Sequence, residues 1–245
     1  MFEQSVLDRI QVIEHSGIRI GGETVVYIDP IRISNAPHDA DLILFTHPHF
    51  DHFSPRDAKK LMKESTVIAA PKSMALMCRL LLGRTPVTLL PAQTYTLCGI
   101  PVETVAAYNR AKPFHLKAMK WLGYILTIGE TKVYISGDTD ITEESKAVSC
   151  DIALLPVGGT GYTVNAEQAA QLAAAIAPHT VIPIHYGKLL GGADAAERFR
   201  AALDNSIRAE IRPSACSDVM ISMILRAAVL IPAGALLGYL IGKYL

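Results

Sequence analysis

The stretch Asp41–His52, which reads DLILFTHPHFDH, decides the fold class and the chemistry of this chain. It opens with a short apolar run, typical of a strand buried on both faces, and ends abruptly in histidines and a carboxylate. Three imidazoles and a carboxylate within six residues are costly to bury without partners. Such a set of side chains suits Zn²⁺ or a similar divalent cation. In an extended stretch His47 and His49 point the same way. Asp51 and His52 come from the following turn and could serve a second ion.

Two further candidate ligands follow strands elsewhere in the chain. Asp138 comes directly after a β-prone run at 132–136, and His185 follows another at 181–184. Because the ends of strands meet at one edge of a sandwich, residues that are distant in sequence can converge there. Taken alone, Asp138 has an ordinary explanation as a turn residue and His185 as a core histidine. Their significance depends on the histidine motif that precedes them.

The rest of the chain alternates short predicted strands with helices. Further strands are predicted at 18–20, 24–28, 66–70, 87–90, 94–97, 102–106, 121–128 and 152–156. Helices are predicted at 54–63, 72–82, 165–177 and 193–203. The first of these begins with Ser54 as N-cap and Pro55 as the first helical residue. Strands outnumber helices, which favours an α/β fold with a core of two sheets and helices outside.

Composition excludes several classes of protein. With 245 residues, 50% of them hydrophobic and 19% charged, the chain is neither disordered nor a small disulfide scaffold. Basic and acidic residues number 23 each, and no long basic block is present, so nucleic acid is not an expected partner. The four cysteines lack C-x-x-C spacing, and we expect reduced thiols. The N-terminus lacks the apolar core of a secretory signal, which predicts a cytoplasmic protein.

The motifs THPHFDH (46–52), SGDTD (136–140) and IPIHYG (182–187) together resemble the H-x-H-x-D-H, Asp, His pattern of the metallo-β-lactamase superfamily. Shorter motifs are similar to the branch with ascorbate-phosphate lactonase-like and N-acylphosphatidylethanolamine phospholipase D-like hydrolases. These are AYN (107–109), KPFH (112–115), WLGY (121–124) and LPVGGT (155–160). The resemblance spans about residues 10–199 and implies a four-layer αβ/βα sandwich with a dinuclear site at one edge.

The resemblance also implies ligands and a reaction. Carried over position by position, the first metal takes His47 and His49, the second takes Asp51, His52 and His185, and Asp138 bridges both. A metal-bound hydroxide would attack a carbonyl or phosphorus centre, with Asp51 and Asp138 as the catalytic carboxylates. The expected cofactor is Zn²⁺, as one or two ions, and Mn²⁺ is an alternative.

One ligand departs from the family pattern. The superfamily normally supplies a third histidine to the first metal, and the expected position holds Asn109. His115 lies six residues further along the chain and could replace it. The third ligand of the first metal is therefore His115, Asn109 or water. If neither side chain binds, the first site would be weak or empty, or would prefer a harder ion. His15 falls near the expected site, where we predict a supporting role rather than ligation.

The segment 109–120 carries four basic residues and no acid. A solvated face is the ordinary explanation, but a metal site bordered by cations favours an anionic substrate such as a phosphate ester or a phospholipid head group. Together with the resemblance, this predicts a phosphodiester, phospholipid-like or lactone substrate, anionic or lipid-like. The predicted substrate-binding residues are Asn109, Lys112, Lys117 and Gly159. Gly159 is included because its turn could offer backbone N–H groups to an anion.

The chain divides into a predicted hydrolase domain at 1–218 and an apolar tail at 219–245. The tail contains no acid and two basic residues. Its uninterrupted apolar part, 227–242, is shorter than the roughly 20 residues that span a bilayer. We expect a C-terminal hydrophobic helix and membrane contact through it. A helix packed on the body or on a second subunit, giving a homo-oligomer, and an artefactual terminus are the alternatives.

Two rival functions remain at this stage. A non-catalytic, metal-binding, membrane-associated adaptor would keep the fold but lack a competent first site. A diiron redox enzyme is disfavoured, because such sites usually carry a carboxylate where this chain has His49.

Overall fold

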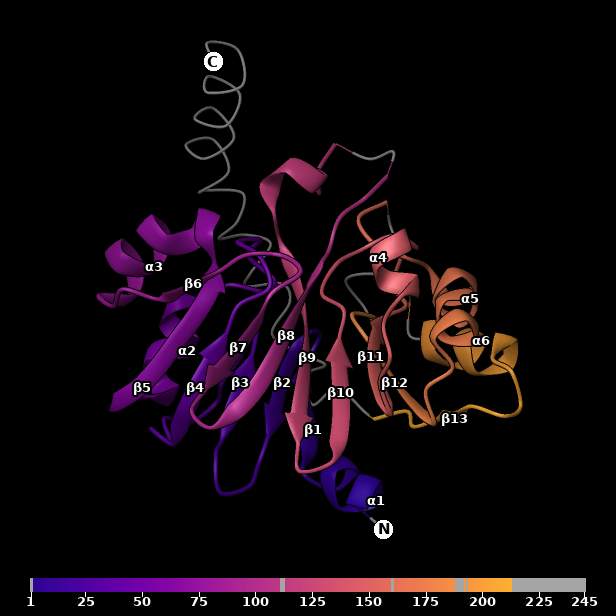
Figure 1. The fold of residues 1–245 in the computed structure, drawn as a ribbon, viewed down its shortest axis with the longest axis horizontal. Coiled ribbons are helices and arrows are strands. Elements are labelled where there is room, and N and C mark those ends of the chain that lie inside the picture. Colours follow the sequence, from indigo (N-terminus) through magenta and orange to yellow (C-terminus); the bar gives the residue numbers. More distant parts are fainter. Residues whose placement is uncertain (1, 111–112, 160, 188–191, 193, 213–245) are drawn as a thin grey trace. The chain divides into compact units, whose positions relative to one another are not determined.

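The computed structural model describes residues 2–110, 113–159, 161–187, 192 and 194–212. Two mixed sheets carry helices on their outer faces (Figure 1). The first sheet has the order β1 (Ile10–Glu14), β2 (Gly17–Ile20), β3 (Val26–Ile28), β4 (Ala40–Leu44), β5 (Met62–Pro71), β6 (Val87–Leu89). The second has the order β13 (Arg208–Ala209), β12 (Thr180–Ile184), β11 (Ile152–Pro156), β10 (Thr131–Ile135), β9 (Leu122–Ile128), β8 (Ile100–Ala106), β7 (Thr94–Leu97).

Each sheet is antiparallel at one end and parallel at the other. In the first, β1–β3 are antiparallel and β3–β6 parallel, with Ile28 opposite Leu44. In the second, β7–β10 are antiparallel and β10–β13 parallel, with Ile135 opposite Leu154. The strands β4, β10, β11 and β12 are therefore all in parallel regions, where polar residues after a strand gather at one edge.

Three apolar clusters define four layers. The central cluster joins the facing sides of the two sheets, for example Leu44 of β4 and Leu154 of β11. A second cluster packs the outer side of the second sheet against α5 (Ala166–Ile176) and α6 (Ala195–Ala202). A third packs the first sheet against α2 (Pro55–Leu61) and α3 (Ala75–Leu82). The prediction of a four-layer αβ/βα sandwich is confirmed for the described residues.

Local signals place most of the helices. Ser54 caps α2 by accepting a hydrogen bond from the backbone N–H of Asp57, and Asn165 and Gln168 form a capping box at the start of α5. The sequence analysis did not identify four short elements: α1 (Phe2–Leu7), β1, α4 (Glu143–Lys146) and β13. Single-turn 3₁₀ helices occupy Lys72–Met74 and Lys117–Met119.

Close backbone approach joins the two sheets at the edge that carries the candidate ligands. The backbone N–H of Leu122, at the start of β9, donates to the carbonyl of Thr46, which follows β4. Gly137 lies beside this junction with a φ of +61°, and a Cβ there would be 3.0 Å from the carbonyl oxygen of Leu122. Only glycine meets both conditions without strain, so Gly137 fixes the position from which Asp138 leaves the sheet.

The predicted hydrophobic helix at 219–245, and with it the domain boundary, lies outside the described residues. Among the helices that are described, none is long and apolar enough to cross a bilayer.

Candidate metal centre

The candidate ligands come from four loops at one edge of the sandwich. The loop after β4 supplies His47, His49, Asp51 and His52; the chain after β8, β10 and β12 supplies His115, Asp138 and His185 respectively. All seven are gathered within one cluster. The motif, the strand-end residues and the distant histidine therefore converge as the sequence predicts, although their roles as ligands stay a prediction.

His47, His49 and His115 form a set that we call the first compartment. One nitrogen of each ring lies within 4.8 Å of the others, and His115 Nε2 is 3.1 Å from His49 Nδ1. The chain's single tryptophan, Trp121, packs against all three rings, with centroid distances of 4.8–5.2 Å. Three imidazoles against a buried apolar wall match the donor set that zinc prefers.

His15, Asp51, His52 and His185 form the second compartment, in which one donor atom of each lies within 4.8 Å of the others. Asp51 Oδ2 is 3.3 Å from His15 Nε2 and 3.4 Å from His185 Nε2. The rings of His15 and His185 also contact each other, tilted by 42° with centroids 3.9 Å apart. His15 thus contacts two predicted ligands directly, which fits its expected supporting role and brings it close enough to be a fourth donor.

Asp138 lies between the two compartments. Its Oδ1 is 3.4 Å from His52 Nε2 and 3.3 Å from His185 Nε2, in the second compartment. Its Oδ2 faces the first compartment, 3.9 Å from His115 Nε2. A buried carboxylate that presents one oxygen to each donor set can bridge two cations.

Burial and charge set the protonation of the two compartments differently. Burial lowers the pKa of His115 to about 4 and, together with the charge of His52, lowers the pKa of His47 well below its usual value. These rings are neutral, which is the form that binds a metal ion. In the second compartment burial also disfavours charge on His185, but Asp138 outweighs it and raises the pKa to about 9. Burial opposes ionisation of Asp138, yet His185 and His52 hold its pKa well below the usual range.

Seven buried side-chain atoms at this centre have no hydrogen-bond partner within the described part of the chain: His47 Nε2, His52 Nε2, Asn109 Oδ1, His115 Nδ1, Asp138 Oδ1, His185 Nδ1 and His185 Nε2. Where they face one another, they do so at 3.3–3.4 Å without hydrogen-bond geometry. Buried polar atoms without partners are rare in native proteins. Lone pairs of these atoms that no hydrogen bond uses are available to bind divalent cations. The residues present therefore suit the metal that the fold implies.

Asp29, which follows β3, is a site residue that the sequence analysis missed. Its carboxylate accepts hydrogen bonds from the backbone N–H of Thr46 at 2.8 Å, the Thr46 hydroxyl at 2.5 Å and His52 Nδ1 at 2.7 Å. Thr46 Oγ1 also lies 2.9 Å from His47 Nδ1. Because Asp29 and Thr46 take the Nδ1 protons, the Nε2 lone pairs of both histidines are left for a metal. The rule that selected Asp138, an acid directly after a strand, would also have found Asp29.

Backbone strain marks the same region. Three of its non-glycine residues have positive φ: His15 at 53°, Asp29 at 46° and His185 at 56°. Such conformations cost on the order of 1–3 kcal/mol each and persist only where the surroundings fix them.

The predicted substrate-binding residues are dispersed. Asn109 is buried beside the first compartment; its backbone N–H donates to the carbonyl of His115 at 2.7 Å, while its side chain donates to Asp140. Gly159 has a φ of +70° in the turn before α5. Lys112 lies outside the described residues. The roles of Asn109 and Gly159 in substrate binding stay predictions.

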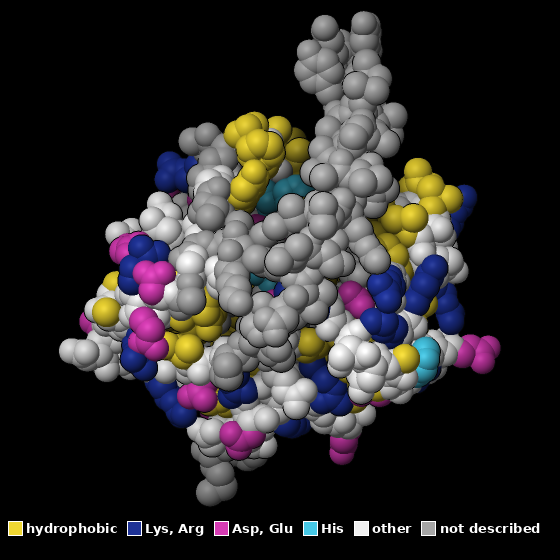
Figure 2. All heavy atoms as spheres, turned by 180° about the vertical axis from the view of Figure 1, so that it is seen from behind, with side chains coloured by type: hydrophobic (Ala, Val, Ile, Leu, Met, Phe, Trp, Pro, Cys, Tyr) yellow, Lys and Arg dark blue, Asp and Glu magenta, His cyan; other side chains and the backbone are white. Residues whose placement is uncertain are grey.

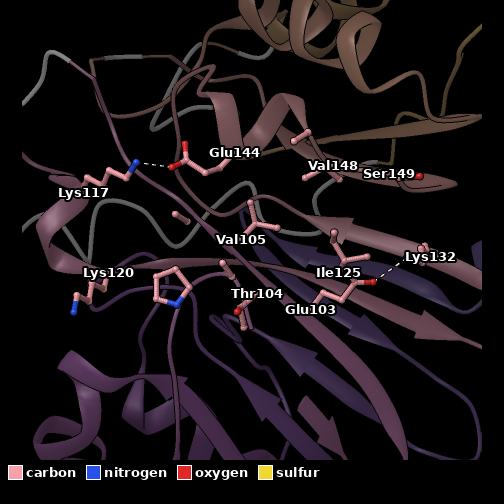
Figure 3. Close-up of a pocket in the computed structure, with 14 residues that line it drawn as sticks. Glu103, Thr104, Val105, Lys117, Lys120, Ile125, Lys132, Glu144, Val148 and Ser149 are labelled. Carbon is pink, nitrogen blue, oxygen red and sulfur yellow. Dashed lines mark hydrogen bonds and ion pairs between the residues drawn. The ribbon is translucent and has the colours of Figure 1, made fainter. Parts of the chain in front are cut away.

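Lys117 lines a cleft on the outer face of the second sheet (Figure 3), and none of the candidate metal ligands lines it. The cleft has a volume of about 540 Å³ and an apolar floor that includes Val105, Ile125 and Val148. The ammonium of Lys117 points to Glu144 and forms an ion pair with it. Its role in substrate binding therefore stays a prediction.

Comparison with known proteins agrees with this geometry. A family model for the beta-lactamase superfamily domain matches residues 9–185. A Thermoplasma acidophilum protein, named as a UPF0173 metal-dependent hydrolase, is 32% identical over 201 residues, covering 76% of this chain and 87% of the relative. A Methanosphaerula palustris protein with the same family name is 28% identical, covering 78% and 89%.

A solved structure from Parabacteroides distasonis, proposed to be a metal-dependent hydrolase, has 30% sequence identity and a TM-score of 0.69. The match covers 84% of this chain and 92% of that one. The similarity therefore extends over nearly the whole sandwich, not only over the histidine motif.

Proposed function

The chain belongs to the beta-lactamase superfamily and is a metal-dependent hydrolase in the UPF0173 family, and we propose that it uses two cations to hydrolyse an amphiphilic ester. The proposed substrates are phosphodiesters, phospholipid-like molecules and lactones. Zinc is the proposed cation, with manganese as the alternative, because imidazole dominates both donor sets. The branch indicated by the shorter motifs stays a prediction.

The observation that carries the proposal is the pair of donor sets on opposite sides of Asp138. Each set contains three or more imidazole or carboxylate groups within 4.8 Å, and each includes a buried Nε2 atom without a hydrogen-bond partner. When bound, divalent cations supply Lewis-acid polarisation and a water of lowered pKa. The protein's own contribution is to hold neutral imidazoles and ionised carboxylates in fixed positions.

The two carboxylates differ in access. Asp51 has 13% of its side chain exposed against 3% for Asp138, so Asp51 is the carboxylate that an entering water can reach. The surrounding histidines outweigh burial and hold the pKa of Asp51 well below its usual range, which keeps it ionised at neutral pH. Its Oδ2 can accept a hydrogen bond from that water and orient it. Asp138 is enclosed and serves as the bridging group.

Exposed apolar side chains beside the ligands support an amphiphilic substrate. Phe50 lies between His49 and Asp51 and is 64% exposed, while Phe114 and Leu116 flank His115 and are 51% and 47% exposed. The ring of Phe114 packs on Tyr162 with centroids 5.1 Å apart. We call Phe50, Phe114, Leu116 and Tyr162 the apolar rim. It offers contact area to the acyl or aryl group of a substrate whose phosphate or carbonyl group lies at the cations.

The test is hydrolysis of three substrates by zinc- and manganese-loaded protein: bis(4-nitrophenyl) phosphate, a short-chain phospholipid and an acylated lactone. We expect the loaded protein to hydrolyse at least one of the three. For a substrate with an acyl chain, Phe114→Ala should raise KM several-fold and change kcat little. Lys59→Ala, on the exposed side of α2, is the control. A loaded protein that hydrolyses none of the three refutes this substrate class.

The adaptor alternative depended on an incomplete first compartment. His115 is fully buried against His47 and His49, so the missing donor is available and that argument loses its basis. Cytoplasmic location, self-association and membrane contact through 219–245 remain proposals drawn from the sequence.

A further inference from the structure

The helix α3 is apolar on both sides, although only one side is covered. Its inner side packs Cys78 and Leu82 into the cluster against the first sheet. Its outer side carries Leu76, Met77, Leu80 and Leu81, which are 62%, 36%, 68% and 45% exposed. We call these four residues the α3 apolar face. Four large apolar side chains on one short helix form a contiguous patch of the kind that marks an interaction site.

The charged residues of the segment that carries this face have one sign. From residue 65 to residue 102 the sequence contains no Asp or Glu, and its only basic residues are Lys72, Arg79 and Arg84. Lys72 and Arg79 are exposed, and none of the three forms an ion pair with a described residue. Figure 2 shows hydrophobic side chains next to Lys and Arg at the upper right, the side on which α3 lies in that view.

The α3 apolar face begins at the edge of the sandwich that holds the metal centre. The turn Lys72–Met74 and α3 follow the end of β5, which runs parallel to β4, and the end of β4 leads into His47. Figure 1 shows α3 at the arrowhead end of β5. The apolar rim belongs to loops at this same edge, so two exposed apolar groups border one end of the molecule.

We propose that α3 is a membrane-contact helix that binds bilayers containing anionic lipids. Leu76, Leu80 and Leu81 enter the boundary between head groups and acyl chains, and Lys72 and Arg79 bind lipid phosphates. Leucines and cations without acids are the composition of helices that lie in this interface. A second copy of the chain is a poorer occupant, because a two-fold contact through α3 would place Arg79 near its own symmetry mate without a carboxylate between them. The proposal depends neither on hydrolysis nor on 219–245.

The first test places a reporter on the helix itself. In the full chain, Leu80→Trp adds an exposed fluorophore to the single buried Trp121 of the wild type. Vesicles of phosphatidylcholine and phosphatidylglycerol (3:1) should shift the emission of Leu80→Trp to the blue, and brominated acyl chains should quench it. Wild type is the matched control for any change at Trp121. If the vesicles bind but the reporter emission is unchanged, another segment makes the contact and the proposal is wrong.

The second test measures vesicle partitioning by co-sedimentation. Leu76→Ser combined with Leu80→Ser should weaken binding by about tenfold or more, because two exposed leucines leave the bilayer. Arg79→Glu should weaken it by at least about fivefold, and Arg198→Glu on α6 should not. Turnover of a soluble substrate should be unchanged in all of these variants, which checks their folding. Equal binding to pure phosphatidylcholine, or a wild-type dimer that Leu80→Asp makes monomeric, would overturn the proposal.

Discussion

Replacement of Asp29 by asparagine should weaken metal binding without removing any proposed ligand. Asp29 Oδ1 accepts from the backbone N–H of Thr46, and Oδ2 accepts from the Thr46 hydroxyl and from His52 Nδ1. In Asp29→Asn the amide oxygen can keep the first bond, but the NH₂ group then faces two donors. His52 must lose its partner or move its proton to Nε2, the atom that faces Asp138. The proton would then block the metal-binding lone pair.

The magnitude follows from the bond that is lost. A hydrogen bond to a charged group contributes about 1.5–3 kcal/mol, which corresponds to roughly a 10–100-fold weaker metal affinity, the range seen for outer partners of metal-binding histidines. Competition with a chromophoric chelator measures this affinity. Asp8→Asn is the matched control, because Asp8 is exposed beside α1, at the end of the molecule opposite the candidate metal centre (Figure 1). An Asp29→Asn affinity within about twofold of wild type would refute the argument that Asp29 orients His52.

Three further predictions concern the same centre. Metal analysis should find one cation fewer per chain in His115→Ala, because a ring nitrogen of His115 lies within 4.8 Å of those of His47 and His49, whereas Asn109→Ala should keep the wild-type content, because the amide of Asn109 donates to Asp140. Urea unfolding should show Gly137→Ala to be less stable by about 1–3 kcal/mol, since its φ of +61° and the nearby Leu122 carbonyl disfavour a Cβ. Although burial disfavours charge on both rings, Asp138 raises the pKa of His185 to about 9, and Asp138, Asp51 and Asp29 raise the pKa of His52 well above its usual value. A cation must therefore displace a proton from each ring, and affinity measured from pH 8.5 to 6.5 should fall by at least about tenfold per unit. A pH-independent affinity would contradict that assignment.

The sequence predicted the fold and most of the centre because both are encoded locally. A buried strand that ends in H-x-H-x-D-H fixes four side chains within six residues, and the strand-end rule adds Asp138 and His185. The choice between Asn109 and His115 could not be made this way. It depends on the path of the chain after β8, where the Asn109 N–H bonds to the His115 carbonyl and the histidine ring is enclosed by Trp121.

Other features depend on tertiary contacts that no local pattern reports. The strand-end rule selects Asp29 as a candidate, but only the packed structure shows that its carboxylate orients His52 through hydrogen bonds with Thr46 and His52. The leucines of α3 read as an ordinary buried helix, and only the packed structure shows that Leu76 and Leu80 are left exposed. The short elements α4 and β13 carry too few residues for a periodic signal.

The most direct test of the account is metal content measured together with turnover. Purified protein loaded with zinc should hold two cations per chain, and chelation should abolish hydrolysis that added zinc or manganese restores. Asp138→Ala should lose both activity and at least one cation, because Asp138 contacts donors of both compartments. A protein that binds no divalent cation, or an Asp138→Ala variant with wild-type hydrolysis, would contradict the central claim.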